Sequence, residues 1–189
     1  MQCNEIAAAV SRRPVPHVFG TQHRERASQP FDLTQSFVNV ADKVHRSGIP
    51  WDDASGDRLR EWLKLDRSTF NDAARVAILP IGFCYPGAGE NGGDLPPRPA
   101  CAPLWHERLL THLPDLQLTL LVGQYAQGHY LAAGRKGSLT ETVKTFSEYG
   151  PRFFPLPHPS WRSPIWMRKH PWFEQAVIPE LRRSVGKLI

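Results

Sequence analysis

A histidine flanked by prolines, in the stretch FFPLPHPSWRS, is the first chemical feature that stands out in the chain. Pro157 and Pro159 fix their own φ angles, donate no backbone N–H and drive the preceding residues into extended conformations. The stretch therefore predicts a stiff loop that holds His158 at the end of an apolar strand, with Trp161 and Arg162 just beyond it. Such a group suits a flat, anionic ligand, but an ordinary turn with a capping histidine would have the same residues.

The C-terminal segment, residues 151–189, combines positive charge with tryptophan. It holds seven lysines and arginines against two glutamates, so it accounts for the whole formal net charge of +5. Its tryptophans are Trp161, Trp166 and Trp172. Basic and aromatic residues together are typical of nucleic-acid binding, where cations contact phosphates and rings stack on bases. A solvated basic helix face would have a similar composition, so composition alone leaves both interpretations open.

Sequence motifs of several other chemistries are missing. The glycine-rich residues 87–93 lack the lysine and the Ser/Thr of a phosphate-binding loop, and the chain contains no GxSxG elbow. Its eight histidines are dispersed without HExxH spacing. These observations weigh against a nucleotide-phosphate loop, a serine hydrolase and a catalytic zinc site.

The three cysteines, Cys3, Cys84 and Cys101, do not form a disulfide framework. Cys84 and Cys101 bracket the glycine- and proline-rich residues 85–100. Two thiolates would supply half of the four ligands that an iron–sulfur cluster usually takes, and no CxxC pair completes the set. The alternative is a pair of buried structural thiols.

Three apolar runs predict the buried strands of a single α/β domain, at residues 75–83, 116–123 and 152–157. Helical patterns lie between and beyond them, at residues 56–65, 101–113, 124–134, 138–150 and 172–185. Strands that alternate with helices favour a largely parallel sheet, and ligands bind beyond the carboxyl ends of such strands. We therefore expect a common site where three loops follow the strands, at residues 84–99, 123–125 and 158–164.

Helix 56–65 has two suitable N-caps, Ser55 and Asp57. In helix 101–113, three large apolar residues spaced by four predict the buried face: Trp105, Leu109 and Leu113.

The N-terminal part of the chain carries weaker signals. Residues 1–30 are polar and interrupted by prolines, so we expect them to be mostly irregular. Residues 31–45 fit an amphipathic helix, although SFVNV within them also fits a short strand.

Four segments, taken in order, resemble one known family. SGIPWDDASGDRLREWL has a G-x-P-[FW] pattern before a helix, and ILPIGFCYPGAGENGGDLPPRPACAPLW is rich in Cys, Pro and Gly. LTLLVGQYA joins a strand to a glycine turn, and FPLPHPSWR contains an HPS motif. Together they resemble the uracil-DNA glycosylase superfamily, in particular bacterial members related to the iron–sulfur type. The resemblance makes residues 43–189 the family domain and residues 1–42 a divergent N-terminal segment of the same compact domain.

The resemblance implies a fold, an activity and a partner. The fold is a three-layer α/β sandwich with a central, largely parallel twisted sheet. The activity is DNA repair by base excision: a uracil or another deaminated base is flipped out of DNA, and its N-glycosidic bond is hydrolysed. The reaction needs no external cofactor, and an iron–sulfur cluster, if bound, would be structural.

The resemblance also assigns roles to particular residues. His158 becomes the donor that stabilises negative charge on the departing base, as an oxyanion hole does. Trp51 becomes the aromatic that stacks on the base, with Gly82 and Phe83 beside it. The residues expected to contact DNA are Ser160, Trp161, Arg162, Arg168 and Lys169. A core tryptophan at position 51 and a surface stack of Trp161 with Arg162 remain the alternatives.

Two positions depart from the family pattern. FVNVAD at residues 37–42 occupies the place of the first motif, whose glycines and proline are missing. Asn39 falls where a water-positioning residue sits in some members, so the resemblance makes it the second catalytic residue; a coincidental match is the alternative. Pro80 stands where many relatives carry an asparagine that reads the uracil edge, and a proline side chain cannot make that contact.

These departures leave three functions open. The first is the glycosylase, acting on single- or double-stranded DNA. The second is a catalytically inactive, nucleic-acid-binding member of the same superfamily, and the third is a hydrolase of free nucleosides or nucleotides. The sequence shows no secretory signal and no apolar run of about 18 residues. We therefore expect a cytoplasmic protein that contacts no membrane. We also expect it to be a monomer.

Overall fold

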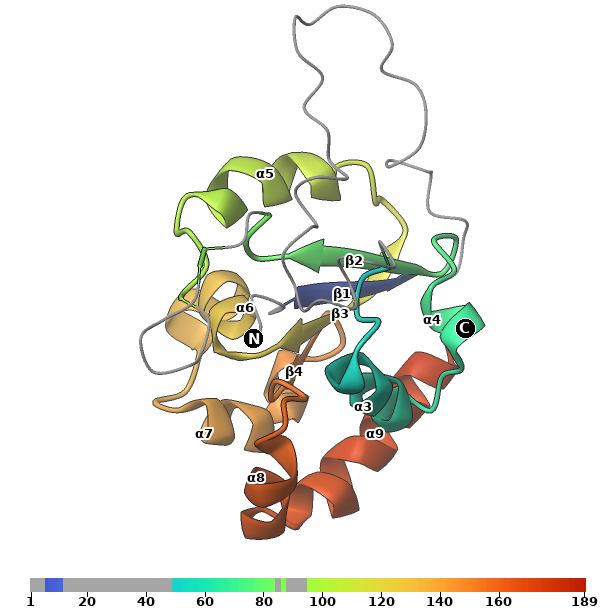
Figure 1. Ribbon diagram of the computed structural model, residues 1–189, viewed down its shortest axis with the longest axis vertical. Helices are drawn as coiled ribbons and strands as arrows, with labels where there is room; N and C mark the ends of the chain where they lie inside the picture. The colour runs from blue at the N-terminus through green and yellow to red at the C-terminus, as the bar shows by residue number, and fades with distance from the viewer. Residues whose placement is uncertain (1–5, 12–48, 84–85, 88–94) are drawn as a thin grey trace, which may run out of the picture.

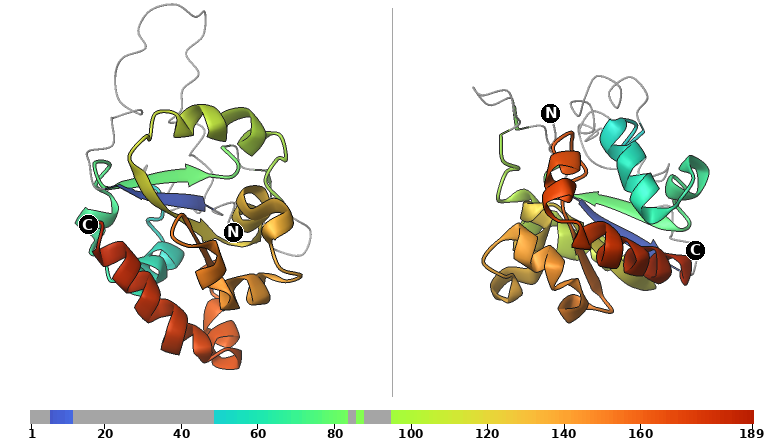
Figure 2. Two further views of the ribbon diagram at one scale, coloured as in Figure 1. Left: turned by 180° about the vertical axis from the view of Figure 1, so that it is seen from behind. Right: turned by 90° about the horizontal axis from the view of Figure 1, so that it is seen from below.

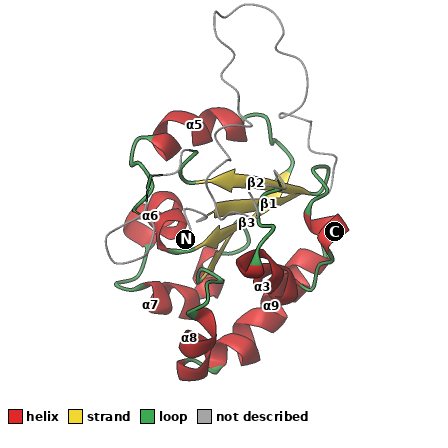
Figure 3. Ribbon diagram, in the orientation of Figure 1, coloured by secondary structure: helices red, strands yellow, loops and turns green. Residues whose placement is uncertain are grey.

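The computed structural model describes residues 6–11, 49–83, 86–87 and 95–189 of the chain. Figure 1 shows a small sheet at the centre of these residues, and Figure 3 shows the helices around it. The strands are β1 (Ile6–Ser11), β2 (Val76–Pro80), β3 (Leu116–Val122) and β4 (Phe153–Leu156). The α-helices are α3 (Ala54–Leu63), α4 (Arg67–Phe70), α5 (Cys101–Leu110), α6 (Gln124–Leu131), α7 (Leu139–Lys144), α8 (Ser163–Lys169) and α9 (Ile178–Gly186). Shorter turns are η1 (Ala132–Gly134), η2 (Phe146–Tyr149) and the π-helical η3 (Phe173–Val177), which leads into α9.

The strand order in the sheet is β2-β1-β3-β4. β1 is antiparallel to both of its neighbours, whereas β3 and β4 are parallel. It follows that β2, β3 and β4 all run in one direction and that their carboxyl ends lie at the same edge. The three strands expected from the apolar runs are thus confirmed, with β1 inserted between two of them.

Strand β1 lies within residues 1–30, which the sequence predicts to be mostly irregular; the other residues of that range lie outside the described part of the chain. The sequence of β1, IAAAVS, is rich in alanine, which has little intrinsic preference for strands. The strand forms hydrogen-bonded ladders with β2 on one side and β3 on the other. Pairing with two flanking strands therefore stabilises the extended conformation of β1, which its local propensity does not favour.

The sheet lies between two apolar clusters, which makes the fold a three-layer α/β arrangement (Figure 2). Alternate residues of β3 face opposite layers, as the pleat of a strand requires. Leu120 packs in a cluster with residues of α3, η3 and α9, including Leu59 and Leu181. Leu121 packs on the other face with Ala126 of α6 and with α5. The predicted α/β class is confirmed.

Two local expectations about helices were wrong. Helix α3 is capped by Asp53, whose carboxylate accepts a 2.8 Å hydrogen bond from the Gly56 N–H, and not by Ser55 or Asp57. In α5, Trp105 is 45% exposed, while His106 is buried. The orientation of α5 follows from His106, because this side chain hydrogen-bonds to the end of β2 and so must face the sheet.

No helix in the described part of the chain has the length and apolar character needed to cross a membrane.

A proline in the middle of β1 should disrupt the sheet. Ala8 pairs with Ile78 on one side and Leu120 on the other. Proline cannot donate to a ladder, so we expect Ala8→Pro to lower the free energy of unfolding by about 3 kcal/mol or more. Urea denaturation followed by circular dichroism measures the change.

Ala54→Pro is the matched control for that substitution. Ala54 is the first residue of α3, a position that accepts proline. Asp53 before it is extended, which is the conformation that a following proline favours. We expect near-wild-type stability for this variant, and an equal loss in both would contradict a central role of β1.

Candidate active site

The carboxyl ends of three strands meet in one row across the sheet. Ile6 of β1 pairs with Pro80 of β2 and with Val122 of β3, and Val122 in turn pairs with Leu156 of β4. The segments that follow Pro80, Val122 and Leu156 therefore begin side by side. This is the edge at which the sequence predicted a common site.

The end of β4 is attached to the start of α6. The Leu156 carbonyl accepts a 2.9 Å hydrogen bond from the Gly123 N–H and another of 2.9 Å from Nε2 of the buried Gln127. These bonds fix the point from which the histidine loop departs.

The loop after β4 is a tight, hydrogen-bonded turn, as its prolines predict. The His158 carbonyl accepts from the Ser160 N–H and from the Ser163 hydroxyl, both at 2.8 Å. Helix α8 begins at Ser163, directly after this turn. The half-buried His158 is therefore held between the end of a strand and the start of a helix.

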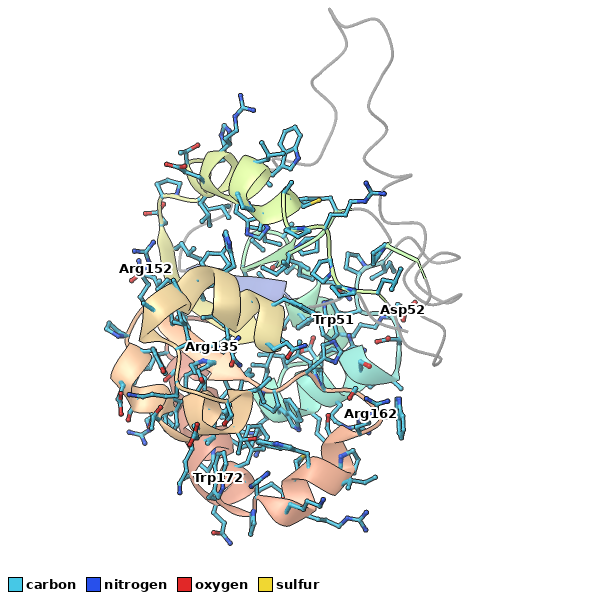
Figure 4. All side chains as sticks on the ribbon, turned by 90° about the vertical axis from the view of Figure 1, so that its left-hand side faces the viewer. Trp51, Asp52, Arg135, Arg152, Arg162 and Trp172 are labelled. Atoms are coloured by element: carbon cyan, nitrogen blue, oxygen red, sulfur yellow. The ribbon has the colours of Figure 1, made fainter. Side chains whose placement is uncertain are left out.

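Trp51 and His158, two residues to which the sequence assigned roles, lie against each other. Their ring centroids are 5.6 Å apart and their planes differ by 23°, which is a stacked arrangement. Trp51 is only 1% exposed, and Figure 4 shows it within the fold. In this conformation the histidine occupies one face of the indole, and the ring has no face open to solvent.

The backbone at Trp51 adopts an unusual conformation. Its φ is +62°, in the left-handed region that bulky residues rarely enter. The Trp51 carbonyl accepts a 3.1 Å hydrogen bond from Nη1 of the buried Arg60, whose Nη2 also contacts Asp57 at 2.6 Å. Gly56 packs so closely that a Cβ on it would lie 1.8 Å from the Trp51 oxygen. Local contacts therefore lock the turn that presents Trp51.

A second arginine of α3 joins this turn to the histidine loop. Arg58 Nη1 donates to the Ser160 carbonyl at 2.6 Å and to the Pro159 carbonyl at 3.2 Å. Sequence reasoning missed both Arg58 and Arg60, because arginines on an amphipathic helix normally indicate its solvated face. Here one helix positions both members of the Trp51–His158 pair.

The residues predicted to contact DNA surround the histidine loop and continue along α8. Ser160 accepts a 3.3 Å hydrogen bond from the Arg162 N–H. Trp161 is 59% exposed, and the Arg162 guanidinium lies over its ring at 4.9 Å. Figure 4 shows Arg162 at the margin of the molecule. Arg168 and Lys169 are exposed in the last turn of α8.

The segment after β2 contacts a different group of aromatic residues. Gly82 is buried, and a Cβ on it would lie 3.0 Å from the Pro97 side chain. Phe83 packs edge-on against His106, with centroids 5.9 Å apart. Gly82 and Phe83 thus lie at the common edge of the sheet, beside α5.

His106 is a buried, hydrogen-bonded histidine that sequence reasoning missed. Its Nε2 lies 2.9 Å from the Pro80 carbonyl, and its Nδ1 lies 2.7 Å from the Tyr130 hydroxyl. A carbonyl can only accept, so Nε2 carries the hydrogen, and the neutral ring accepts from Tyr130 at Nδ1. The i, i+4 spacing with Ala102, also buried, was the available signal for this face of α5.

Burial shifts the acid–base equilibria of this cluster toward its neutral forms. Desolvation lowers the pKa of His106 below its ordinary value of 6.5, and the bond to Pro80 opposes it only in part. Burial likewise lowers the pKa of the adjacent His129 and raises the pKa of Tyr130 to about 12. The cluster is therefore a neutral clamp on the end of β2.

The structure describes only one of the remaining predicted site residues, Cys101. Asn39 and Cys84 lie outside the described residues. Cys101 is half-buried at the start of α5 and is not in a disulfide. Among the described residues, no group of three or more His, Cys, Asp or Glu side chains is placed to hold a metal ion. With three cysteines in the chain, the residues do not fit an all-cysteine, four-ligand iron–sulfur cluster.

The α/β fold agrees with the comparison to known families. A sequence model of the Uracil DNA glycosylase superfamily matches residues 39–182, most of the chain. The protein belongs to this superfamily. The matched region includes both Trp51 and His158.

A methyl group on Gly56 should displace the turn that carries Trp51. We expect Gly56→Ala to lower the free energy of unfolding by about 3 kcal/mol, because its Cβ would overlap a backbone oxygen that cannot move without breaking the Arg60 bond. Chemical denaturation measures this loss. Gly186→Ala in α9 is the control: a Cβ there would meet no atom within 4 Å, so the change should be neutral or slightly stabilising. A Gly56→Ala variant as stable as this control would contradict the locked turn.

The neutral state of His106 should make stability depend on pH. Its folded pKa is depressed, so its contribution is complete above 6.5 and is lost as pH falls, when the unfolded chain takes up the proton first. We expect His106→Gln, which can still donate to Pro80, to flatten the decline between pH 6.5 and 5. The slope should change by at most about 1.4 kcal/mol per pH unit.

Urea unfolding at a series of pH values measures that slope. The wild type, measured in parallel at the same pH values, provides the reference slope. An identical slope in the His106 variant would show that the ring is not held neutral.

Proposed function

We propose that the protein is a DNA glycosylase that extrudes uracil or another deaminated base from DNA and hydrolyses its N-glycosidic bond. Membership of the superfamily supports glycosylase-type DNA repair. The observation that carries the proposal is the stacked pair of Trp51 and His158 at the carboxyl edge of the sheet. This is where an extruded base would meet a fixed histidine.

The chemistry assigns His158 to the departing base. The bond between C1′ of the sugar and the base nitrogen breaks, and its electron pair leaves with the base. Water forms the new bond to C1′ and releases a proton. Negative charge grows on a carbonyl oxygen of the base, and a preoriented donor near that oxygen lowers the barrier. The hydrogen-bonded turn around the His158 carbonyl supports this role, because it fixes the histidine before the base arrives.

The base would contact Trp51 and the Gly82–Phe83 segment. Arg60 holds the Trp51 carbonyl, and His106 holds the carbonyl of Pro80, from which the Gly82–Phe83 segment departs. Asn39 would orient the attacking water, as the sequence predicts.

The exposed residues around the histidine loop would contact DNA. Trp161 with Arg162 over its ring combines a flat apolar surface with a positive charge, which suits the gap left by an extruded base and the phosphates beside it. Arg168 and Lys169 extend the positive surface along α8. Binding that depends on these cations should weaken as salt rises.

A catalytically inactive DNA-binding protein is the second candidate. The altered FVNVAD segment at residues 37–42 favours it, because the glycines and proline of the family's first motif are absent. This candidate predicts salt-dependent DNA binding without an abasic product.

Excision from labelled oligonucleotides tests the proposal. DNA with one uracil, single-stranded or opposite guanine, is incubated with the protein and cleaved with alkali at abasic sites. We expect strand cleavage by the wild type. The excision rate of His158→Ala should fall by about 100-fold or more, because the donor to the leaving group is lost.

His112→Gln, which changes an exposed histidine outside the site, is the control. This variant should excise uracil at the wild-type rate. Equal rates for the His158 and His112 variants would remove His158 from the chemistry. DNA binding without cleavage of uracil, hypoxanthine or xanthine substrates would favour the inactive protein.

A further inference from the structure

The indole N–H of Trp51 is a buried donor without an acceptor. Trp51 is 1% exposed, and its Nε1 has no hydrogen-bond partner among the residues that the structure describes. Buried tryptophan N–H groups normally find a partner, because leaving one unsatisfied costs free energy. A phenylalanine would supply an apolar ring without this cost. The N–H therefore needs an explanation beyond packing.

The position of this donor points to a ligand of the active site. The Trp51 ring stacks on His158, and Nε1–H lies in the plane of the indole, so it is directed along the ring edge and away from the stacked face. The donor therefore belongs to a ring that is in direct contact with the proposed catalytic histidine. The base in the proposed reaction must come next to His158.

The turn at Trp51 maintains the donor in place. Its left-handed backbone is held by the Arg60 hydrogen bond and the close packing of Gly56. Strained backbone that surroundings hold in place is found preferentially at ligand sites. The unsatisfied donor and the strained turn thus occur in one residue, through independent observations.

We infer that Trp51 Nε1–H donates a hydrogen bond to a carbonyl oxygen of the extruded base, an inference that rests on the proposed glycosylase function. Deamination replaces an amino group with a carbonyl oxygen, which turns a donor into an acceptor. An N–H at this position is satisfied by uracil, hypoxanthine or xanthine. It opposes the amino hydrogens of cytosine and adenine, which would leave two donors facing each other.

The end of β2 explains why the donor comes from Trp51. Position 80 is a proline, so it offers no side-chain amide and no N–H. The Pro80 carbonyl already accepts from His106. Trp51 therefore supplies the donor that reads the edge of the base, in place of a side chain from β2. This contact does not separate uracil from thymine, which carries the same carbonyl groups.

Equilibrium binding tests this inference separately from catalysis. The probes are oligonucleotides with one 2′-fluorinated nucleotide, which resists glycosidic cleavage, bearing uracil or cytosine, and a third with a tetrahydrofuran abasic site. We expect the wild type to bind the uracil probe more tightly than the cytosine probe. Trp51→Phe should reduce this preference about tenfold or more and leave affinity for the abasic probe unchanged.

Two controls separate the lost N–H from lost volume. Trp62→Phe makes the same change at another buried tryptophan, which packs edge-on against Phe173, and should keep the preference. Benzothienylalanine, introduced at position 51 alone by amber suppression, keeps the bicyclic ring and replaces N–H with sulfur. It should lose the preference as Trp51→Phe does. If it keeps the preference, ring volume is the cause and the inference is overturned.

The outcomes distinguish the inference from the proposed function. A wild type that prefers the uracil probe through Trp51 but forms no abasic product would overturn the glycosylase proposal and support the donor. A wild type that excises uracil while both position-51 variants keep its base preference would overturn the donor alone. A wild type that binds the uracil and cytosine probes equally would also overturn it.

Discussion

The hydrogen bond from Arg60 to the Trp51 carbonyl is the contact on which the arrangement of the site depends. Its acceptor belongs to a residue with φ of +62°, a conformation that costs about 1–3 kcal/mol for a bulky side chain. A hydrogen bond from a charged donor contributes about 1.5–3 kcal/mol, which is enough to offset that cost. Arg60 is itself buried, so the carbonyl and Asp57 satisfy a guanidinium that water reaches poorly. The turn and the arginine thus stabilise each other.

Helix α3 transmits this local constraint to the histidine loop. Arg58 is two residues from Arg60, and its guanidinium binds the carbonyls of Pro159 and Ser160. A rotation of α3 would therefore move Trp51 and His158 together rather than apart. The sheet adds a second constraint, because the register across β1 and β3 fixes where β4 ends. The stacked pair is determined by contacts far apart in the sequence.

Much of the fold follows from local patterns, and the exceptions have physical causes. The apolar runs of β2, β3 and β4 and the prolines around His158 predict their conformations, since burial and fixed φ angles act within a few residues. β1 was missed because its three alanines acquire strand geometry only by pairing on both sides.

The predicted site was incomplete for a similar reason. Pattern and resemblance found Trp51 and His158, but not the arginines that hold them, because their acceptors are backbone carbonyls and no sequence motif marks those. His106 was missed because the larger Trp105 suggested the wrong face of α5, although Trp105 is half-exposed. The buried side of a helix depends on the groups that the neighbouring sheet presents to it. Here the sheet presents the Pro80 carbonyl, which accepts a hydrogen bond from His106.

His106 and Trp51 illustrate how buried polar groups differ in meaning. Both lie near the carboxyl edge of the sheet, and both are nearly inaccessible. Each nitrogen of His106 has a partner within the chain, so the histidine is fully accounted for as a clamp on β2. A histidine beside another histidine and a tyrosine resembles a catalytic cluster in composition. However, both ring nitrogens already have partners, so neither is available to bind a substrate. Trp51 is the reverse case: a residue type usually assigned to the core, whose donor the described residues leave unsatisfied. This unsatisfied donor, and not the titratable cluster around His106, is the observation from which we infer a contact with the base.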